Sequence, residues 1–354
     1  MSVPFLDLSR RGEGLAEAFA AVAESGRFIG GPALDRFERA WGEYCGAEAV
    51  GVNSGTDAIA LALRALGVGP GDEVITAANT CVATITGIVG AGATPVLADV
   101  DERTWTLDPE SARAAVTERT KAIVAVHLYG QCADVAGLAE LGLPIVEDAA
   151  QAHGAEHDGA RPGRVHTAAY SFYPTKNLGA IGDAGAVVTP APEVADRVRM
   201  LRSHGERAEA RGIAVVPGAN SRLDDVQAEV LTRRLAWLGA GNTRRRQLAA
   251  FYLERLDRVG LPVEAPGRLH AWHLFVVLVD DRDAFRARLR DRGVETLVHY
   301  PEPVHRQAAY AHLARDLPLT VSERLCERVV SLPLYPELTD AEAEAVVAAV
   351  RFNR

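Results

Sequence analysis

Residues 121–154 read KAIVAVHLYGQCADVAGLAELGLPIVEDAAQAHG, and this stretch decides the fold class. Its runs 121–130 and 144–150 are short and rich in Val, Ile and Ala, as expected for strands buried on both faces of a sheet. Between them, residues 133–142 have the composition of a short helix. A strand, a helix and a second strand in this order predict neighbouring parallel strands.

The same alternation extends outward over about residues 49–190. Asp108 followed by Pro109 marks one helix start, with a capping residue and then proline at the first helical position. The whole pattern predicts a mostly parallel sheet covered by helices on both faces, with its ligand site at the carboxyl ends of the strands. Further strands are expected at 49–53, 73–77, 94–100, 168–173 and 185–190, and further helices at 57–67, 81–92 and 109–120.

The regular alternation of strands and helices ends beyond about residue 190. Surface helices are expected at 192–205 and 222–238, and a compact α+β unit follows from about residue 244. Thr339 and Glu342 have the spacing of a capping box at the start of a last helix. We therefore predict a large domain over residues 1–240, including the N-terminal segment, and a small domain over 241–354. The small domain is expected to contain helices at 244–256 and 283–293 and strands at 273–279 and 296–300.

Composition excludes several classes of protein. The 354 residues include 38 Lys+Arg and 47 Asp+Glu, a formal charge of −9, which argues against nucleic-acid binding by phosphate attraction. No apolar run is long enough for a bilayer, and the N-terminus lacks the pattern of a signal peptide. The four cysteines are scattered without metal-ligand spacing, so we expect no metal site, no membrane partner and a cytoplasmic location.

Lysine is the most informative residue type, because it occurs only twice, at Lys121 and Lys176. Lys121 directly precedes a buried strand, where a lysine usually lies at the strand end with its amine in water. Lys176 lies in a segment dense in small and polar residues, SFYPTKNLGAIGDAG. It is either a solvent-exposed turn residue or the one amine available for chemistry.

Two further features accompany Lys176. Asp148 ends a predicted strand, where it either caps the next helix or keeps a pyridine nitrogen protonated by its opposite charge. Ser54-Gly55-Thr56 turns from a strand into a helix whose free N–H groups suit an anion. A phosphate turn, then an acid, then a single lysine suggest pyridoxal phosphate, in the order found in enzymes resembling aspartate aminotransferase.

Over nearly its whole length the chain resembles the DegT/DnrJ/EryC1/StrS family of sugar aminotransferases. The resemblance implies a pyridoxal-phosphate-dependent transferase type I fold: α/β, with a mostly parallel seven-stranded sheet sandwiched by helices and a smaller C-terminal α+β domain. The motifs SFYPTKNLGAIGDAG and NSRLDDVQAEVL are most similar to those of the branch that acts on dTDP-linked 3-keto-6-deoxy sugars. The matching stretches are GRFIGGPALDRFERAWGEYCG, NSGTDAIALAL, NTCVATITGI, HLYGQCADV, EDAAQAHGA, SFYPTKNLGAIGDAG, NSRLDDVQAEVL and LVHYPEPVHRQ.

The resemblance also implies roles for individual residues. Lys176 would form the Schiff base with the cofactor and act as general acid and base. Asp148 would pair with the pyridine nitrogen, and Gln151 with the phenolic oxygen. The phosphate would be bound by Gly55, Thr56, Ser171 and, from the partner subunit, Asn220, so a homodimer is implied.

The sequence indicates the residues that would contact the substrate less clearly. Cys81 stands where many relatives place an aromatic side chain against the cofactor ring. An arginine fork suits a diphosphate, and Arg222 is the best-motivated choice. His299 and Tyr300 lie where relatives bring the small domain over the substrate.

The sequence thus predicts transfer of an amino group from L-glutamate, which leaves as 2-oxoglutarate, to a nucleotide-linked keto sugar, with pyridoxamine phosphate as the intermediate cofactor form. Amination at the 4-position of the sugar, and a non-catalytic regulatory protein that binds pyridoxal phosphate, remain alternatives. Lys176 argues against a dehydratase of the same family, which has histidine there. The spacing of Tyr173 and Lys176, without a glycine fingerprint, argues against a short-chain dehydrogenase.

Overall fold

A seven-stranded sheet forms the centre of the protein. The computed structural model describes residues 2–12, 14–207, 209–210 and 212–351. The strand order is β1-β8-β7-β5-β4-β2-β3, and every neighbouring pair is parallel except those that β8 makes with β1 and β7. The strands are β1 Glu48–Val52, β2 Glu73–Ala77, β3 Thr94–Ala98, β4 Thr120–Val126, β5 Ile145–Asp148, β7 Thr167–Ser171 and β8 Gly185–Thr189.

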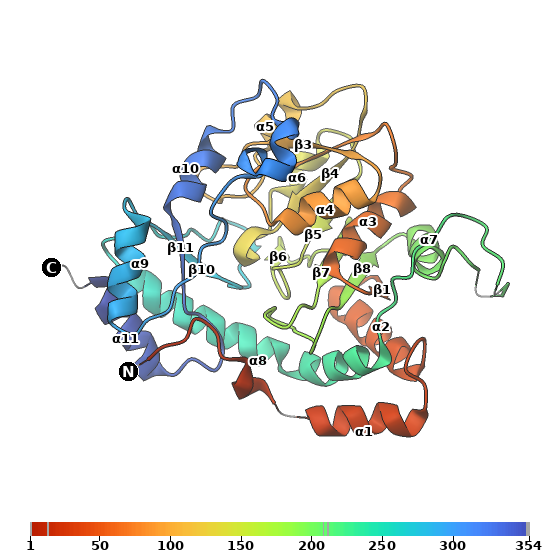
Figure 1. Cartoon of the computed structure of the whole chain (residues 1–354), viewed down its shortest axis with the longest axis horizontal. Coiled ribbons are helices and arrows are strands. Elements are labelled where there is room, and N and C mark those ends of the chain that lie inside the picture. Colours follow the sequence, from red (N-terminus) through yellow and green to blue (C-terminus); the bar gives the residue numbers. More distant parts are fainter. Residues whose placement is uncertain (1, 13, 208, 211, 352–354) are drawn as a thin grey trace.

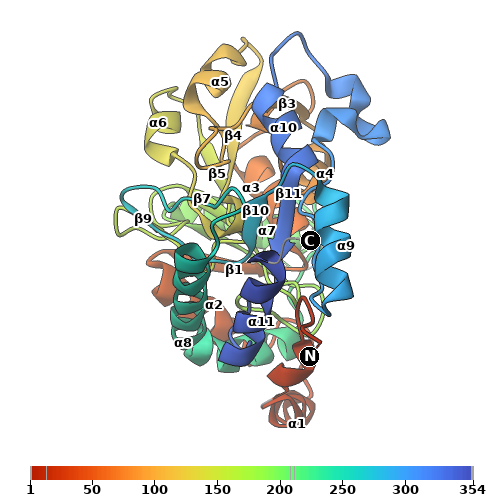
Figure 2. The same cartoon turned by 90° about the vertical axis from the view of Figure 1, so that its left-hand side faces the viewer.

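Helices cover both faces of this sheet (Figures 1 and 2). Successive strand residues alternate between the two faces: in β4, Val124 packs in the cluster that contains α3, whereas Ile123 packs in the cluster that contains α5 and α6. The predicted α/β class and mostly parallel sheet are therefore confirmed. The covering helices are α2 Pro32–Cys45, α3 Gly55–Ala65, α4 Val82–Gly90, α5 Pro109–Ala114, α6 Val135–Ala139 and α7 Pro192–Arg202.

A single helix, α8, spans Asp225–Arg255, where the sequence predicted two helices over 222–238 and 244–256. That prediction was wrong at the join, because residues 239–243 continue the helix. The helix continues because its flanks are fixed: Asn242 is buried and its Nδ2 donates to the His153 carbonyl at 2.7 Å. Arg245 is likewise buried and donates to backbone carbonyls.

The C-terminal elements form a second, smaller cluster. β10 Phe275–Leu278 pairs antiparallel with β11 Val329–Leu332, and the helices are α9 Arg282–Asp291, α10 Thr320–Arg328 and α11 Asp340–Arg351. The predicted capping box is confirmed, since Thr339 N donates to Glu342 Oε2 at 2.8 Å and Glu342 N donates to Thr339 Oγ1 at 3.2 Å. The predicted strand 296–300 was wrong: within it only Leu297 forms a bridge, to Ser331 of β11.

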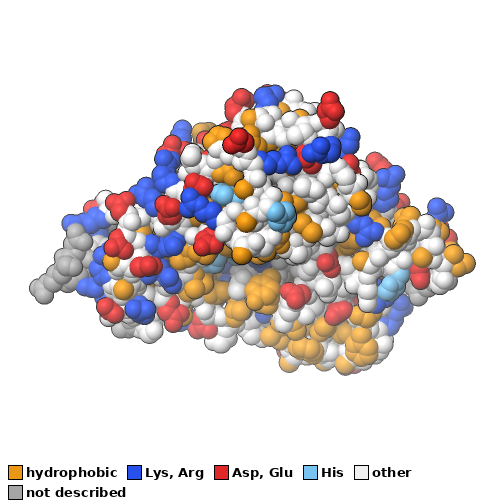
Figure 3. All heavy atoms as spheres, turned by 45° about the horizontal axis from the view of Figure 1, so that its top comes forward, with side chains coloured by type: hydrophobic (Ala, Val, Ile, Leu, Met, Phe, Trp, Pro, Cys, Tyr) orange, Lys and Arg blue, Asp and Glu red, His pale blue; other side chains and the backbone are white. Residues whose placement is uncertain are grey.

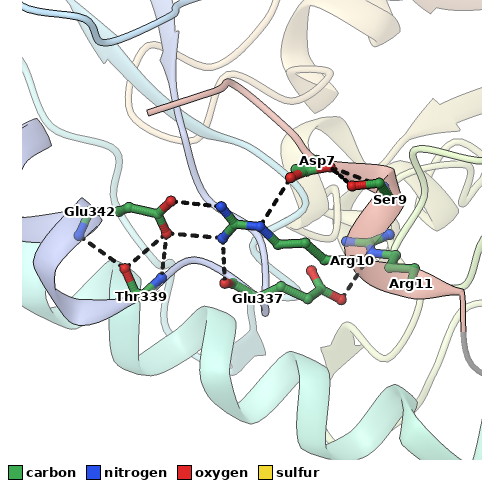
Figure 4. A network of polar contacts seen from close by, with 7 residues as sticks. All are labelled: Asp7, Ser9, Arg10, Arg11, Glu337, Thr339 and Glu342. Atoms are coloured by element: carbon green, nitrogen blue, oxygen red, sulfur yellow. Dashed lines mark hydrogen bonds and ion pairs between the residues drawn. The ribbon is translucent and has the colours of Figure 1, made fainter. Parts of the chain in front are cut away.

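The N-terminal segment runs along these C-terminal elements (Figure 1). Val3 forms a parallel bridge with Val294 and belongs to the same hydrophobic cluster. Figure 4 shows Arg10 contacting Glu342 through two hydrogen bonds of 2.8 and 3.1 Å. The division into domains at residue 240 stays a prediction.

The remaining helices and strands are η1 Leu8–Arg11, α1 Leu15–Ser25, η2 Leu128–Gly130, β6 Glu156–His157, β9 Arg268–Leu269, η3 Val304–Arg306 and η4 Ala308–Leu313. None of the helices in the described ranges is both long and apolar enough to cross a membrane.

Candidate active site

A cavity of about 250 Å³ lies at the carboxyl ends of the strands, beside the N-termini of α3 and α4. We call it the sheet-edge cavity. Parallel strands bring their carboxyl ends to one edge of a sheet, so residues far apart in the chain meet there. It brings together seven of the predicted site residues: Gly55, Thr56, Cys81, Asp148, Gln151, Ser171 and Lys176.

The turn from β1 into α3 forms one end of the cavity. Ser54 caps α3, because its Oγ accepts a hydrogen bond from Asp57 N at 3.1 Å. Gly55 packs so closely on the strand end that an added Cβ would lie 2.5 Å from the Ser171 Cβ. The absence of a side chain exposes the first N–H groups of the helix, and with the helix dipole they form an anion site. The Thr56 and Ser171 hydroxyls border the same space.

Asp148 ends β5 and is buried, with its carboxylate held from two sides. Thr84 Oγ1 donates to Asp148 Oδ2 at 2.7 Å, and Ala150 N donates to Oδ1 at 3.2 Å. Thr84 itself lies 2.9 Å from Thr80 Oγ1. These hydrogen bonds fix a negative charge in the wall of the cavity, as the protonated nitrogen of a pyridine ring requires.

Lys176 lies in the loop between β7 and β8 and points its amine at this cavity. Its own N–H donates to the Tyr173 carbonyl at 2.8 Å, which closes a tight turn. Burial lowers the pKa of the amine, and the acidic groups of Cys81 and Asp148 oppose that effect. A lowered pKa raises the fraction of neutral amine at a given pH, and only the neutral form is a nucleophile or a base.

Gln151 is positioned by two tyrosines. Its Oε1 accepts from the Tyr129 N–H at 2.6 Å, and its Nε2 donates to the Tyr300 hydroxyl at 3.0 Å. Burial raises the pKa of Tyr300 far above its ordinary value, so the phenol stays protonated. Because the carbonyl oxygen of Gln151 is already engaged, the amide presents its N–H groups as donors.

Two predicted residues lie close to the cavity without lining it. Tyr300 reaches it through Gln151 and neighbours the Cys81 thiol. His299 lines a separate cavity of about 380 Å³ on the other side of Thr175, where its Nδ1 lies 2.8 Å from Ser331 Oγ. Burial lowers the pKa of His299 to about 4, so its imidazole is neutral at pH 7.

Asn220 and Arg222 lie outside the sheet-edge cavity of their own chain. Asn220 is exposed, and Arg222 is half-buried with its Nε unpartnered among the described residues. Ser221 anchors this loop, since its Oγ donates to Asp57 Oδ2 at 2.7 Å. The predicted role of Asn220 in a partner subunit stays a prediction.

Sequence reasoning missed Thr84 and Tyr129. A weak signal for the first was available: Thr84 is a polar residue in the first turn of a mostly apolar helix, and Thr80 lies just before that helix. Tyr129 gave no such signal, because it acts through its backbone N–H. Cys81, whose role was predicted, is the N-cap of α4.

Charge is evenly mixed on the face shown in Figure 3, where Lys and Arg side chains lie among Asp and Glu side chains. Within the described ranges, no three His, Cys, Asp or Glu side chains lie close enough together to hold a metal ion.

The comparisons with known proteins agree with this geometry. The model of the DegT/DnrJ/EryC1/StrS aminotransferase family matches residues 10–351. The dTDP-3-amino-3,4,6-trideoxy-alpha-D-glucose transaminase of Streptomyces venezuelae is 50% identical, over 99% of this chain and 95% of the relative. The crystal structure of S. venezuelae DesV in complex with a ketimine intermediate has a TM-score of 0.96 at 49% identity, covering 99% of this chain and 98% of that one. The ntda structure from Bacillus subtilis, with bound cofactor PMP, has a TM-score of 0.92 at 32% identity, covering 99% and 84%.

Proposed function

Because the chain belongs to the DegT/DnrJ/EryC1/StrS aminotransferase family, we propose that it transfers an amino group from L-glutamate to the 3-keto group of a dTDP-linked 6-deoxyhexose. The product is an amino sugar of the kind used in antibiotics or cell-surface glycans. The observation that supports this most directly is the convergence of Lys176 and Asp148 on one cavity that also contains an anion-binding turn. Relatives named as transaminases of dTDP-3-amino sugars support the choice of sugar.

The anion-binding turn, Asp148 and Gln151 fit pyridoxal phosphate at three points. The α3 N-terminus with Thr56 and Ser171 would hold the phosphate, Asp148 the ring nitrogen and Gln151 the phenolic oxygen, and all of these residues line the sheet-edge cavity. When bound, the cofactor supplies the carbonyl carbon that accepts the amino group and a ring that withdraws electrons from the reacting carbon. Asp148 supports that withdrawal by holding the ring nitrogen in its protonated form.

Lys176 performs the proton transfers. Its Nζ would remove the proton from the α-carbon of glutamate and return a proton to the carbon on the other side of the amino nitrogen. A water molecule then adds to the former α-carbon as its bond to nitrogen breaks, so that 2-oxoglutarate leaves and the nitrogen stays behind. The lowered pKa of the amine raises the fraction of its base form at a given pH. The same amine acts in the reverse direction on the sugar, and we therefore expect ping-pong kinetics.

Arg222 and Asn220 act in the site of a partner subunit in this proposal. Both lie on one loop, and Phe28 and Ile29 beside it are 60% and 44% exposed, an apolar surface that suits an interface. Ile29 forms a bridge with Asp224, which places this surface next to the loop. Arg222 would bind the diphosphate of the sugar nucleotide, and His299 and Tyr300 would close over the sugar.

The function is tested by the visible absorption of the purified protein. We expect a yellow protein whose colour bleaches with L-glutamate and returns with a dTDP-3-keto-6-deoxyhexose. Return of colour only with the 4-keto isomer would move the reaction to that carbon. A protein that stays colourless with added pyridoxal phosphate would contradict the proposal, and bleaching without any return by keto sugars would contradict the substrate.

The partner-subunit role is tested by mixing two inactive variants, Lys176→Ala and Asn220→Ala, after joint unfolding and refolding. A hybrid dimer then contains one site with both native residues. Random mixing makes half of the dimers hybrid, so we expect about a quarter of wild-type activity to return. If Asn220 serves its own chain, no site regains both residues and mixing restores nothing.

We also place the enzyme in the cytoplasm. The four cysteines are free thiols, as a reducing compartment allows. A fluorescent-protein fusion in the native host measures this directly, and secretion into the medium would contradict it.

A further inference from the structure

A second cavity, of about 710 Å³, lies on the other side of the Lys176 loop and shares no lining residue with the sheet-edge cavity. We call it the arginine cavity. It is enclosed by the N-terminal segment, the middle of α8 and residues 336–337, and Figure 4 shows part of this wall. Glu337 is its one acidic lining residue. Its six arginines are Arg10, Arg11, Arg233, Arg234, Arg244 and Arg245.

These arginines are only partly neutralised. Arg234 and Arg245 form no ion pair with a carboxylate of the described residues and donate only to backbone carbonyls. Two positive charges in the wall therefore lack a directly paired carboxylate, and the more distant charge of Glu337 offsets them only in part. The other four pair as follows: Arg10 with Asp7 and Glu342, Arg11 with Glu337, Arg233 with Glu229, and Arg244 with Asp340.

Arg245 is the most constrained of the six. Its side chain is 2% exposed, and burial together with the nearby Arg11 lowers its pKa to about 9. Arg11 also lowers the pKa of Arg234, and its own Nη2 is buried without a hydrogen-bond partner. Guanidinium groups buried without a counter-charge destabilise the protein, and an anion placed among them would remove that cost.

An aromatic ring borders the same cavity. Trp237 is 68% exposed and lies one helical turn after Arg233 on α8. An exposed indole beside arginines combines the two groups that bind nucleotides, a stacking face for a base and forks for phosphate oxygens. The volume lies within the range of small-molecule sites.

We propose that the arginine cavity is a second binding site, outside the catalytic one, for a nucleoside diphosphate. The diphosphate contacts Arg11, Arg234 and Arg245, and the base stacks on Trp237. Neither the amino-transfer proposal nor the predicted substrate residues include this site.

Occupancy of the site affects the catalytic lysine through two of these arginines. Arg11 Nη1 donates to the Lys176 carbonyl at 3.4 Å, and Arg234 Nη1 donates to the Gly179 carbonyl at 2.7 Å. A diphosphate competes for the same N–H groups and releases the loop from them. We therefore expect nucleoside diphosphate bound here to slow the glutamate half-reaction.

The test is calorimetric titration of the holoenzyme with dTDP, inorganic pyrophosphate and thymidine. Arg234→Gln and Trp237→Ala should each weaken one class of dTDP sites at least about 10-fold. Arg246→Gln, a change on the same helix outside the cavity, should leave it unchanged. Ala240→Leu narrows the cavity while keeping every arginine, and should weaken dTDP binding at the same sites. Arg222→Gln should spare them, since it belongs to the proposed catalytic site.

Other results overturn the inference. Equal dTDP binding by wild type, Arg234→Gln and Ala240→Leu would show that no such site exists. Pyrophosphate that binds as tightly as dTDP, with no effect of Trp237→Ala, would leave a simple anion site and contradict the nucleotide. These binding data do not depend on turnover, so they are distinct from a failure of the amino-transfer assay.

Discussion

The sheet-edge cavity and the arginine cavity lie against the same loop, but their walls come from different kinds of contact. The first is built from strand ends and helix starts, so its residues lie at the ends of strands and helices that the sequence predicts. The second is built where Arg10, Arg11, Gly14, residues 233–245 of α8 and residues 336–337 meet. Its residues are separated by long stretches of chain, and no local pattern marks them. A site set by topology can thus be predicted from motifs, whereas one set by tertiary packing needs the structure.

The two lysines test the chemistry of the first cavity with the largest expected effect. Lys176→Ala should lower the rate of amino transfer at least about 1,000-fold, because it removes the proton-transferring amine. Lys121→Ala is the matched control, since Lys121 is exposed at the start of β4. Steady-state rates measure the activity of both variants, and circular dichroism shows whether both are folded. Substantial activity in folded Lys176→Ala would reject the assignment.

Two glycines test how tightly each region is packed. Gly55→Ala places a Cβ 2.5 Å from the Ser171 Cβ, and this overpacking costs about 1–3 kcal/mol, or about 5- to 150-fold in cofactor affinity. Gly239→Ala on α8 meets nothing within 4 Å and should stabilise the protein by about 0.5–1 kcal/mol. Cofactor titration and urea unfolding measure the two effects. Equal cofactor affinity in wild type and Gly55→Ala would argue against a phosphate at this turn.

Thr84 tests whether the hydroxyl behind Asp148 matters. Thr84→Val leaves the carboxylate oxygen Oδ2 without this donor, and we expect the glutamate half-reaction to slow about 10-fold. Thr86→Val, on the exposed side of the same helix, should have no effect. Stopped-flow absorbance after mixing with glutamate measures both. Identical rates for the two variants would limit Thr84 to a packing role.

The smallest effect is expected in the ion pair beside the arginine cavity. The hydrogen bond from Arg10 holds the pKa of Glu342 at about 2, with Thr339 helping and burial opposing. Because this folded-state pKa lies below the ordinary value of 4.5, the stabilisation is present above pH 4.5 and is lost as the pH falls toward 2.

Glu342→Gln should therefore lower the Tm by about 1–3 °C at pH 7, and the difference from wild type should shrink below pH 4.5. Calorimetric scans at several pH values measure it. Glu344→Gln, an exposed change on the same helix, is the control. A difference that stays constant from pH 7 to pH 3.5 would show that the charge of Glu342 is not its source.

Sequence patterns were sufficient wherever structure is locally determined. All seven strands of the large sheet coincide with predicted apolar runs, and Gly55, Asp148 and Lys176 lie at the strand ends and loop where they were expected. The failures share a cause. Within the strand expected at 296–300 only Leu297 pairs, with Ser331 of β11, and the gap expected between the helices at 222–238 and 244–256 is closed by the buried contacts of Asn242. Both outcomes depend on partners distant in the chain.

The unbroken helix α8 has a mechanical consequence. At 1.5 Å per residue its 31 residues make a rod about 46 Å long, and it runs without interruption through the predicted domain boundary. A rod cannot serve as a hinge, so any opening of the C-terminal part over the sheet must bend the chain elsewhere. A protease offered the native protein would find no loop to cut at residue 240. Exchange of C-terminal parts between related enzymes would have to splice within a helix, in register with its turns.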